Sequence, residues 1–259
     1  MKKFHIENRK SQRVVGVITE VSSPRGLVFI MHGLGGVKEA KFLVAVAETF
    51  KEQGFSVVRF DTTNSFGESG GSYEQATVTS YYEDLEDVIN WAAQQSWYRE
   101  PFVLVGHSLG GICAALFAQK YPDKVRALAP ISTVVSGALS VEAMRKYNPQ
   151  KWEQWQHTGW REDVYEGRPE LVMRLPWSHL EDRLKYDLLV SASSLTMPVL
   201  LVVGEKDIST PPEHIKLLFD ALPGANEFHL IKNAQHVFCS EEHLCEMRNI
   251  FSQWIGSVL

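Results

Sequence analysis

The sequence predicts an α/β fold with a mostly parallel sheet and helices on both of its faces. Apolar runs such as residues 27–31 and 102–105 are continuous rather than alternating, as expected of strands that are covered on both faces. Each run leads through a short polar connection into a segment with apolar residues at helical spacing, such as residues 38–53. Strands and helices that alternate with short connections favour parallel pairing.

The other predicted elements continue this alternation. Further strands are expected at residues 14–21, 55–60, 125–131, 197–203 and 226–231. Further helices are expected at residues 80–95, 108–121, 211–222 and 241–258. The strand at 14–21 comes before the alternation begins, so we expect it to be antiparallel and to lie near an edge of the sheet.

Residues 132–194 interrupt the pattern, because they contain no good strand and are too long for a structureless loop. Their aromatic residues are Trp152, Trp155, Trp160, Trp177, Tyr147, Tyr165 and Tyr186. We predict a helical cap inserted at the C-terminal edge of the sheet, where open α/β sheets bind ligands. The predicted organisation is a core domain of residues 1–131 and 195–259 with a cap of residues 132–194.

Composition excludes several classes of protein. The net charge of −5 over 259 residues implies no basic face, which argues against nucleic acid as a partner. No apolar run approaches the roughly 18 residues of a membrane span, and the N-terminus lacks the apolar part of a signal peptide. Cys113, Cys239 and Cys245 have no paired spacing, which argues against a disulfide framework and a zinc site. We therefore expect a cytoplasmic protein.

The candidate nucleophile is Ser108, in the Gly-His-Ser-Leu-Gly motif of residues 106–110. The motif follows an apolar strand and opens a helix, which is the setting of a nucleophile elbow that lifts the serine above the strand tip. Its two glycines fit a turn so tight that a side chain there would meet neighbouring backbone. The alternative is a structural serine in a turn.

A serine nucleophile needs a base and a group that orients the base. His236 follows the last predicted strand and precedes the closing helix, so its loop should open on the same sheet edge as Ser108. Asp207 lies at the tip of the preceding strand and could hold the imidazole in the required tautomer. Glu205 and Asp61, also near strand tips, are the alternatives for the acid.

An oxyanion that forms during acyl transfer needs N–H donors aimed at it. One candidate is the backbone N–H of Leu109, directly after the nucleophile. The other is the N–H of Leu34 in the His-Gly-Leu-Gly-Gly segment of residues 32–36, where glycines let the backbone approach a substrate. A plain glycine-rich turn is the alternative for this segment. His32 is expected to brace the loop.

Together, the motifs at 32–36 and 106–110, with Asp207 and His236, resemble the α/β-hydrolase superfamily over nearly the whole chain. Within it, the chain is similar to small carboxylesterases of the cinnamoyl/feruloyl-esterase-like and monoacylglycerol-lipase-like groups. The resemblance implies an eight-stranded sheet with a helical cap and catalysis without metal or cofactor. Residues 61–69 depart from the family pattern Asp-x-Arg-Gly-x-Gly-x-Ser, because they are one residue longer and lack the Arg-Gly pair.

The expected function is that of a serine carboxylesterase (EC 3.1.1 type) whose partner is a small-molecule ester. The aromatic residues of the cap favour a short-chain or aromatic acyl group. Two alternatives remain open. One is a small-molecule binding protein that retains the triad, and the other is an amidase, thioesterase or monoacylglycerol lipase on the same fold.

Overall fold

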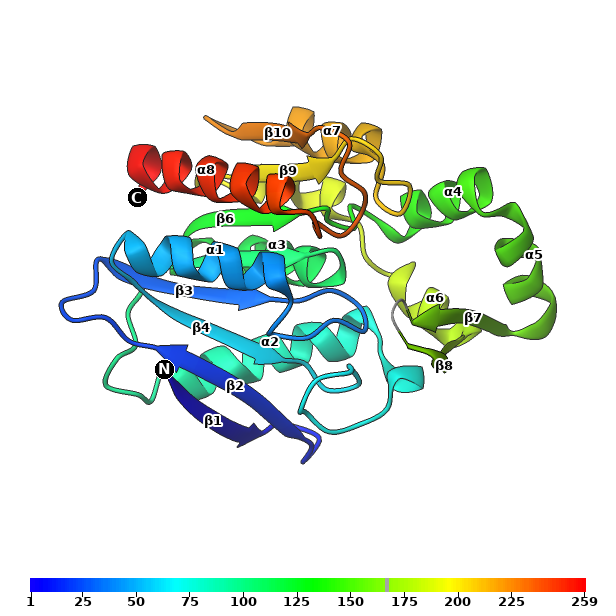
Figure 1. The fold of residues 1–259 in the computed structure, drawn as a ribbon, viewed down its shortest axis with the longest axis horizontal. Coiled ribbons are helices and arrows are strands. Elements are labelled where there is room, and N and C mark those ends of the chain that lie inside the picture. Colours follow the sequence, from blue (N-terminus) through cyan, green and yellow to red (C-terminus); the bar gives the residue numbers. More distant parts are fainter. Residues whose placement is uncertain (166–167) are drawn as a thin grey trace.

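The computed structural model describes the backbone of residues 1–165 and 168–259 and the side chains of residues 1–164 and 172–259. Within this part of the chain, an eight-stranded sheet has the order β1-β2-β4-β3-β5-β6-β9-β10 (Figure 1). Its strands are β1 (Lys2–Glu7), β2 (Arg13–Thr19), β3 (Gly26–Met31), β4 (Phe55–Asp61), β5 (Phe102–His107), β6 (Val125–Ile131), β9 (Leu200–Gly204) and β10 (Glu227–Ile231).

The sheet is parallel from β4 to β10, and only the pairs β1–β2 and β2–β4 are antiparallel. This confirms the predicted fold class. The sequence pattern did not reveal β1, the edge strand. Half of its six residues are charged, and only Phe4 and Ile6 supply apolar contacts. Phe4 covers Gly16 of the neighbouring strand and stacks on Trp91 with ring centroids 4.4 Å apart.

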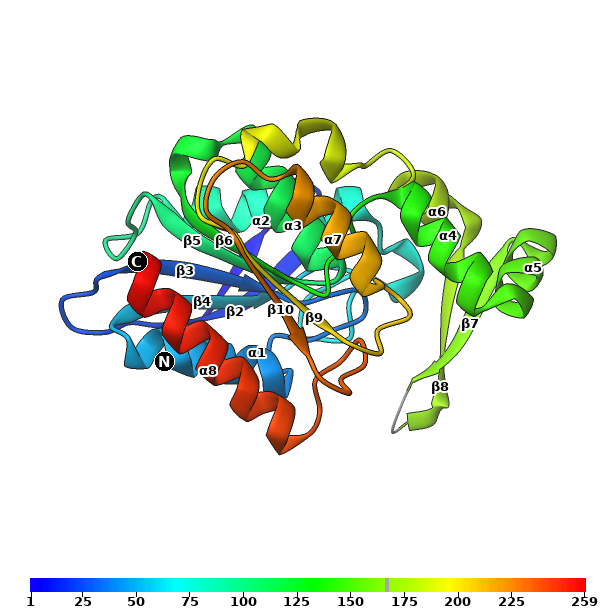
Figure 2. The ribbon, with the colours of Figure 1, turned by 90° about the horizontal axis from the view of Figure 1, so that it is seen from above.

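Helices form a layer on each face of the sheet (Figure 2). α1 (Lys41–Glu52) and α8 (Glu241–Val258) cover one face, while α2 (Val78–Ala92), α3 (Leu109–Lys120) and α7 (Pro212–Ala221) cover the other. Short 3₁₀ turns are η1 (Tyr73–Gln75) and η2 (Pro122–Lys124). The two layers explain why the inner strands β3 and β5 are buried along their whole length.

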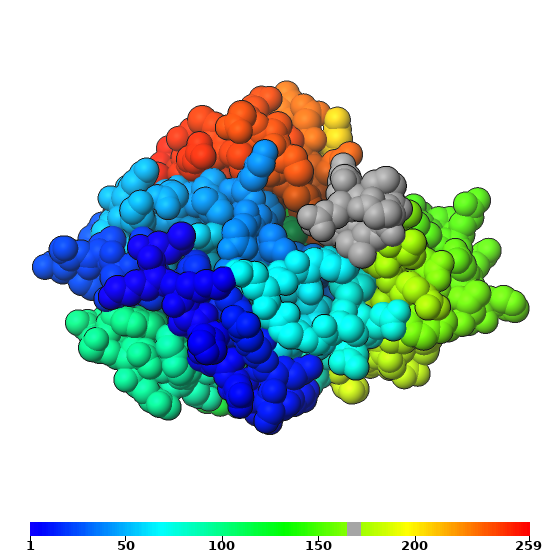
Figure 3. Space-filling view, turned by 60° about the horizontal axis from the view of Figure 1, so that its bottom comes forward, coloured from blue at the N-terminus to red at the C-terminus, as the bar shows by residue number. Residues whose placement is uncertain are grey.

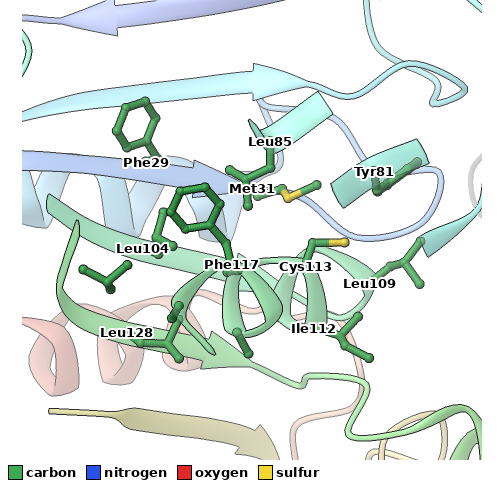
Figure 4. Close-up of a cluster of buried hydrophobic side chains, with 14 of the residues drawn as sticks. Phe29, Met31, Tyr81, Leu85, Leu104, Leu109, Ile112, Cys113, Phe117 and Leu128 are labelled. Carbon is green, nitrogen blue, oxygen red and sulfur yellow. The ribbon is translucent and has the colours of Figure 1, made fainter. Parts of the chain in front are cut away.

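Strand β5 shows how both faces of the sheet are filled. Val103 and Val105 point into the cluster with α1 and α8, whereas Leu104 points into the cluster with α2 and α3. Figure 4 shows the second cluster, in which Phe29 and Leu104 from the sheet meet Phe117 of α3. The strand that carries the candidate nucleophile is therefore held from both sides at its base.

The segment between β6 and β9 projects from the C-terminal edge of the sheet (Figures 1 and 2). It contains α4 (Gly137–Tyr147), α5 (Pro149–Thr158), β7 (Trp160–Tyr165), β8 (Arg168–Pro176), α6 (Trp177–Arg183) and the 3₁₀ segment η3 (Leu188–Ser194). We call α4 to α6 the cap. The space-filling view shows the region around η1 lying against the cap, and η1 contacts β8 (Figure 3).

The expectation that residues 132–194 contain no strand is wrong, because β7 and β8 pair as an antiparallel hairpin. Charged residues in both strands hide the strand pattern in the sequence, and pairing brings them together. Arg174 of β8, for example, forms an ion pair of 3.0 Å with Glu162 of β7. The side chain of Tyr165 lies outside those that the structure describes.

The two ends of the predicted cap segment lie side by side. Gly137 N–H donates to the carbonyl of Tyr186, and Leu188 N–H donates to the carbonyl of Val135, at 3.0 and 2.9 Å. Val135 and Leu188 also pack in the core cluster with α3. The domain boundaries at 131/132 and 194/195 stay a prediction.

Across the described ranges 1–165 and 168–259, no helix is both long enough and apolar enough to cross a bilayer.

Candidate active site

The turn between β5 and α3 has the geometry of a strand–turn–helix elbow. Ser108 has φ 52° and ψ −114°, a backbone conformation that costs energy for any residue with a side chain. Its N–H donates to the carbonyl of Ile131 at 2.9 Å, which ties the turn to β6. A Cβ atom on Gly106 would lie 2.2 Å from the carbonyl oxygen of Gly110. The turn therefore requires glycine at position 106.

Gly110 packs against the loop that carries Leu34, and we expect Gly110→Ala to destabilise the fold by about 1–3 kcal/mol through overpacking. A Cβ atom at this position would lie 2.3 Å from the carbonyl oxygen of His32, which is backbone and cannot turn away. Urea unfolding measures the loss. Gly256→Ala is the matched control, since nothing lies within 4 Å of its added methyl group and α8 favours alanine. Equal stability of the two variants would contradict the expectation.

Three side chains from separate loops form one hydrogen-bonded line at the C-terminal edge of the sheet. Ser108 Oγ lies 2.9 Å from His236 Nε2, and His236 Nδ1 lies 2.8 Å from Asp207 Oδ2. Ser108 follows β5, Asp207 follows β9 and His236 follows β10. The Asp207 side chain is fully buried, whereas the His236 ring is 25% exposed. The arrangement can remove a proton from the serine hydroxyl as it attacks a substrate.

The Asp207 carboxylate is held by more than the histidine. Oδ1 accepts the N–H groups of Ser209 and Thr210 at 2.8 and 2.9 Å, and Oδ2 accepts the Thr210 hydroxyl at 2.8 Å. Burial acts to raise the pKa of Asp207, but the hydrogen bonds from His236 and Thr210 outweigh it and leave the pKa lowered. An ionised carboxylate only accepts, so it fixes a proton on Nδ1 and leaves the lone pair of Nε2 facing Ser108.

His107 and Thr210 are two neighbours of this line that the sequence argument did not identify. His107 Nε2 lies 2.9 Å from the carbonyl oxygen of His236. Burial, with the adjacent His236, lowers the pKa of His107 to about 3, so its ring is neutral and donates to that carbonyl. The position of His107 inside the elbow motif was the available signal. For Thr210 the available signal was the Asp-x-x-Thr spacing, since an aspartate often accepts hydrogen bonds from residues just after it.

The loop of the candidate oxyanion donor Leu34 crosses close to Ser108. A Cβ atom on Gly33 would lie 2.9 Å from Ser108 Cβ, so only glycine allows this approach. The His32 ring braces the loop. Its Nδ1 donates to the carbonyl of Gly33 at 2.7 Å, and its Nε2 accepts the N–H of Thr62 at 3.0 Å. Leu109, the other candidate donor, opens α3, whose first N–H groups have no acceptor within the helix.

The two alternative acids have other partners. Glu205 accepts the N–H of Asn233 at 2.8 Å. Asp61 accepts Lys38 Nζ and the Glu68 N–H at 2.7 and 2.9 Å, and both Asp61 and Lys38 are almost fully buried. Burial acts to lower the pKa of Lys38, but hydrogen bonds to Asp61 and Glu68 outweigh it and raise the pKa. Asp61 and Lys38 thus hold the unusual loop 61–69 in place.

A cavity of about 600 Å³ opens beside His236, and Ser209, Val237 and Cys239 also line it. Its volume is within the range of small-molecule sites, about 300–1,000 Å³. Among the described side chains, those of residues 1–164 and 172–259, no group of three or more His, Cys, Asp or Glu is placed to hold a metal ion.

Comparison with known proteins identifies the family to which the chain is similar. The model of the family described as serine aminopeptidase, S33, matches residues 22–178. A 31.7 kDa protein encoded between traX and finO in Escherichia coli is 28% identical over 240 residues, which cover 81% of this chain and 82% of that protein. Palmitoyl-protein thioesterase ABHD10, mitochondrial, from Mus musculus is 30% identical over 195 residues, which cover 72% of this chain and 60% of that protein.

The fold is also that of a solved structure. Est1E from Butyrivibrio proteoclasticus, with ferulic acid bound, superposes with a TM-score of 0.80 at 22% identity over 98% of both chains. This likeness shows the fold alone. Because the family model covers more than half of the sequence, the chain belongs to the serine aminopeptidase S33 family of α/β-hydrolases.

Proposed function

We propose that the protein is a serine carboxylesterase. The observation that carries the proposal is the continuous line in which His236 contacts Ser108 at 2.9 Å and Asp207 at 2.8 Å. Membership of a family of hydrolases with esterase and thioesterase relatives supports it.

In the proposed mechanism, Ser108 Oγ attacks the ester carbonyl while His236 Nε2 takes the hydroxyl proton. The tetrahedral oxyanion is stabilised by the N–H groups of Leu34 and Leu109. His236 returns the proton to the leaving alcohol as the ester bond breaks, which leaves Ser108 acylated. Water then attacks the acyl-enzyme with His236 as base, and the acid product leaves. Asp207 orients His236 and stabilises its protonated form.

We propose a short-chain or aromatic acyl group as the substrate's acid part. Aromatic side chains gather near the loop of Leu34. The Leu34 side chain packs in one cluster with Phe66, Tyr73 and Trp155. The rings of Phe66 and Tyr73 stack with centroids 4.8 Å apart. A thioester is the second candidate, favoured by the similarity to a relative named as a thioesterase. A cytoplasmic location is also proposed, supported by the free thiols of Cys113, Cys239 and Cys245.

The experiment that tests the proposal combines labelling with a substrate panel. A fluorophosphonate probe is expected to label Ser108, located by mass spectrometry of the digested protein. 4-Nitrophenyl esters from acetate to laurate, one aryl ester, and a matched thioester and amide then give kcat/KM values. We expect the highest values for short and aryl esters. A sharp preference for laurate would contradict the acyl assignment, and absence of both labelling and turnover would favour a binding protein.

A further inference from the structure

A second cavity, of about 310 Å³, lies between the cap and the loop that follows β9. Its walls include Lys151 of α5, Arg161 and Asp163 of β7, Arg183 of α6, and Ile208 and Ser209. Ile208 and Ser209 directly follow Asp207, and the Ser209 N–H is one of the donors to the Asp207 carboxylate. The cavity therefore adjoins the candidate active site.

Arg183 is held in this cavity by a neutral partner. Its Nη2 donates to His179 Nε2 at 2.7 Å, while His179 Nδ1 donates to the carbonyl of Ala76 at 2.7 Å. Burial lowers the pKa of His179 well below its usual value, so the ring carries no charge. Arg183 Nε is buried without a hydrogen-bond partner in the part of the chain that the structure describes. Burial lowers the pKa of Arg183 to about 10, which still leaves it charged at neutral pH.

The nearest acid on its own helix does not neutralise Arg183. Asp182 accepts the Thr79 N–H at 3.0 Å and also accepts the hydroxyl of Thr79. Its Oδ1 further pairs with Lys185 at 3.4 Å. The Asp182 carboxylate is therefore committed to α2 and to a lysine outside the cavity lining.

The facing wall carries more positive charge than negative. Asp163 forms ion pairs with Lys151 at 2.5 Å and with Arg161 at 2.8 Å, so one negative charge faces two positive charges. The Arg161 guanidinium lies over the Trp155 ring, 5.3 Å from its centroid. Arg161 and Arg183 line the same cavity, and repulsion from Arg161 adds to the effect of burial in lowering the pKa of Arg183. Among the described lining residues, Asp163 is the one carboxylate beside Lys151 and the two arginines. Two arginines in one cavity with so little countercharge suit an oxyanion, which they can bind with paired N–H donors.

The cavity is also linked to the loop of the candidate oxyanion donor. Burial raises the pKa of Tyr73, and the positive charge of Arg161 opposes that rise. The Tyr73 ring lies against Gly35, where an added Cβ atom would be 2.8 Å from the ring. Gly35 follows Leu34 directly. Tyr73 is therefore a shared neighbour of the Leu34 loop and of the cavity that holds the two arginines.

We propose that the natural substrate carries an anionic group, a carboxylate or a phosphate, which Arg183 and Arg161 bind while the scissile ester lies at Ser108. This inference rests on the proposed function, since it names the class of ester that the site takes. The anionic group belongs to the substrate and takes no part in bond breaking. Its role is to position the substrate and to select charged esters over neutral ones.

Matched substrates test the selection. 4-Nitrophenyl hydrogen glutarate and 4-nitrophenyl pentanoate differ only in a terminal carboxylate, and 4-nitrophenyl 4-phosphonobutanoate supplies the phosphonate arm. 4-Carboxyphenyl butanoate and 4-carbamoylphenyl butanoate place the charge on the alcohol side. We expect a higher kcat/KM for the charged member in at least one comparison. Equal or lower values for every charged ester would overturn the inference, and the phosphonate arm identifies which anion is preferred.

Variants assign that preference to the arginines. Arg183→Met is expected to lower the charged-to-neutral ratio of kcat/KM by roughly 10- to 100-fold, as expected for loss of charge-assisted hydrogen bonds. Arg161→Met, in a different element, is expected to lower the same ratio. Arg145→Met is the matched control, because its guanidinium lies over Trp152 and it does not line the cavity. An unchanged ratio in both cavity variants would contradict the inference.

A binding measurement separates this inference from the proposed function. Calorimetry with Ser108→Ala compares glutaryl-4-nitroanilide with pentanoyl-4-nitroanilide, which need no turnover. We expect tighter binding of the charged amide, weakened by adding Arg183→Met and partly restored by Arg183→Lys. Loss of ester turnover in Ser108→Ala without charge selectivity would overturn the inference alone. Charge selectivity with turnover retained in Ser108→Ala would instead overturn the proposed function.

Discussion

Replacement of Ser108 by alanine is expected to lower kcat for 4-nitrophenyl butanoate by roughly 10⁴–10⁶-fold, the loss that is typical when a serine hydrolase loses its nucleophile. The alanine has no oxygen to form the acyl-enzyme, and His236 loses its hydrogen-bond partner at 2.9 Å. Because the substrate still contacts the rest of the site, KM should change little. Stopped assays at high enzyme concentration measure the residual rate.

The control for this variant is Ser257→Ala, near the end of α8, whose hydroxyl bonds only to the backbone of the same helix in the described part of the chain. It should keep full activity. Urea unfolding of both variants shows whether the fold is intact. Retention of more than about one hundredth of wild-type kcat by Ser108→Ala would exclude Ser108 as nucleophile, given the much larger losses that are typical.

Asp207→Asn is expected to lower kcat by roughly 10⁴-fold while the geometry is preserved. The amide nitrogen of asparagine can face Nδ1 of His236, which then must accept and carries no proton. The proton moves to Nε2, and His236 can no longer act as a base toward Ser108. Measurement of kcat and KM on the same ester separates this loss from weaker binding.

Glu205→Gln is the matched control for Asp207→Asn, because Glu205 is the acid two residues earlier in the same turn. Its carboxylate bonds to the N–H of Asn233. A glutamine oxygen can accept that bond equally well, so activity should remain within about threefold of wild type, an energy difference of less than 1 kcal/mol. A large loss in Glu205→Gln with little loss in Asp207→Asn would reverse the assignment of the acid.

Much of the sheet could be predicted from sequence because its strands are buried on both faces. Burial on both faces leaves a run of apolar residues, as in β3 and β5, which no other short element shows as clearly. The strands that escaped prediction, β1, β7 and β8, lie outside the doubly covered part of the sheet. Charged residues interrupt their apolar pattern, and only pairing with a partner strand makes them regular.

The candidate site shows a similar division. Ser108, Asp207 and His236 could be proposed together because each follows a strand, and parallel strands bring their C-terminal tips to one edge. The roles of His107 and Arg183 could not be proposed from the sequence. His107 bonds to a backbone carbonyl 129 positions away, and Arg183 depends on a histidine whose own partner lies 103 positions earlier. The position of His107 in the motif marks the residue, but the distant partner of such a contact leaves no pattern in a single sequence.

The adjacent ends of the segment that holds the cap have an evolutionary consequence. Ser136 and Asp187 form a β-bridge where the chain leaves and rejoins the core. A segment with neighbouring ends can be exchanged for another of different length at little cost in loop closure, which grows only slowly with length. Arg161 and Arg183 lie within this exchangeable segment, whereas Ser108, Asp207 and His236 do not. Lineages that share the sheet could therefore acquire new substrates by grafting a different insert, with no change to the residues that follow the strands.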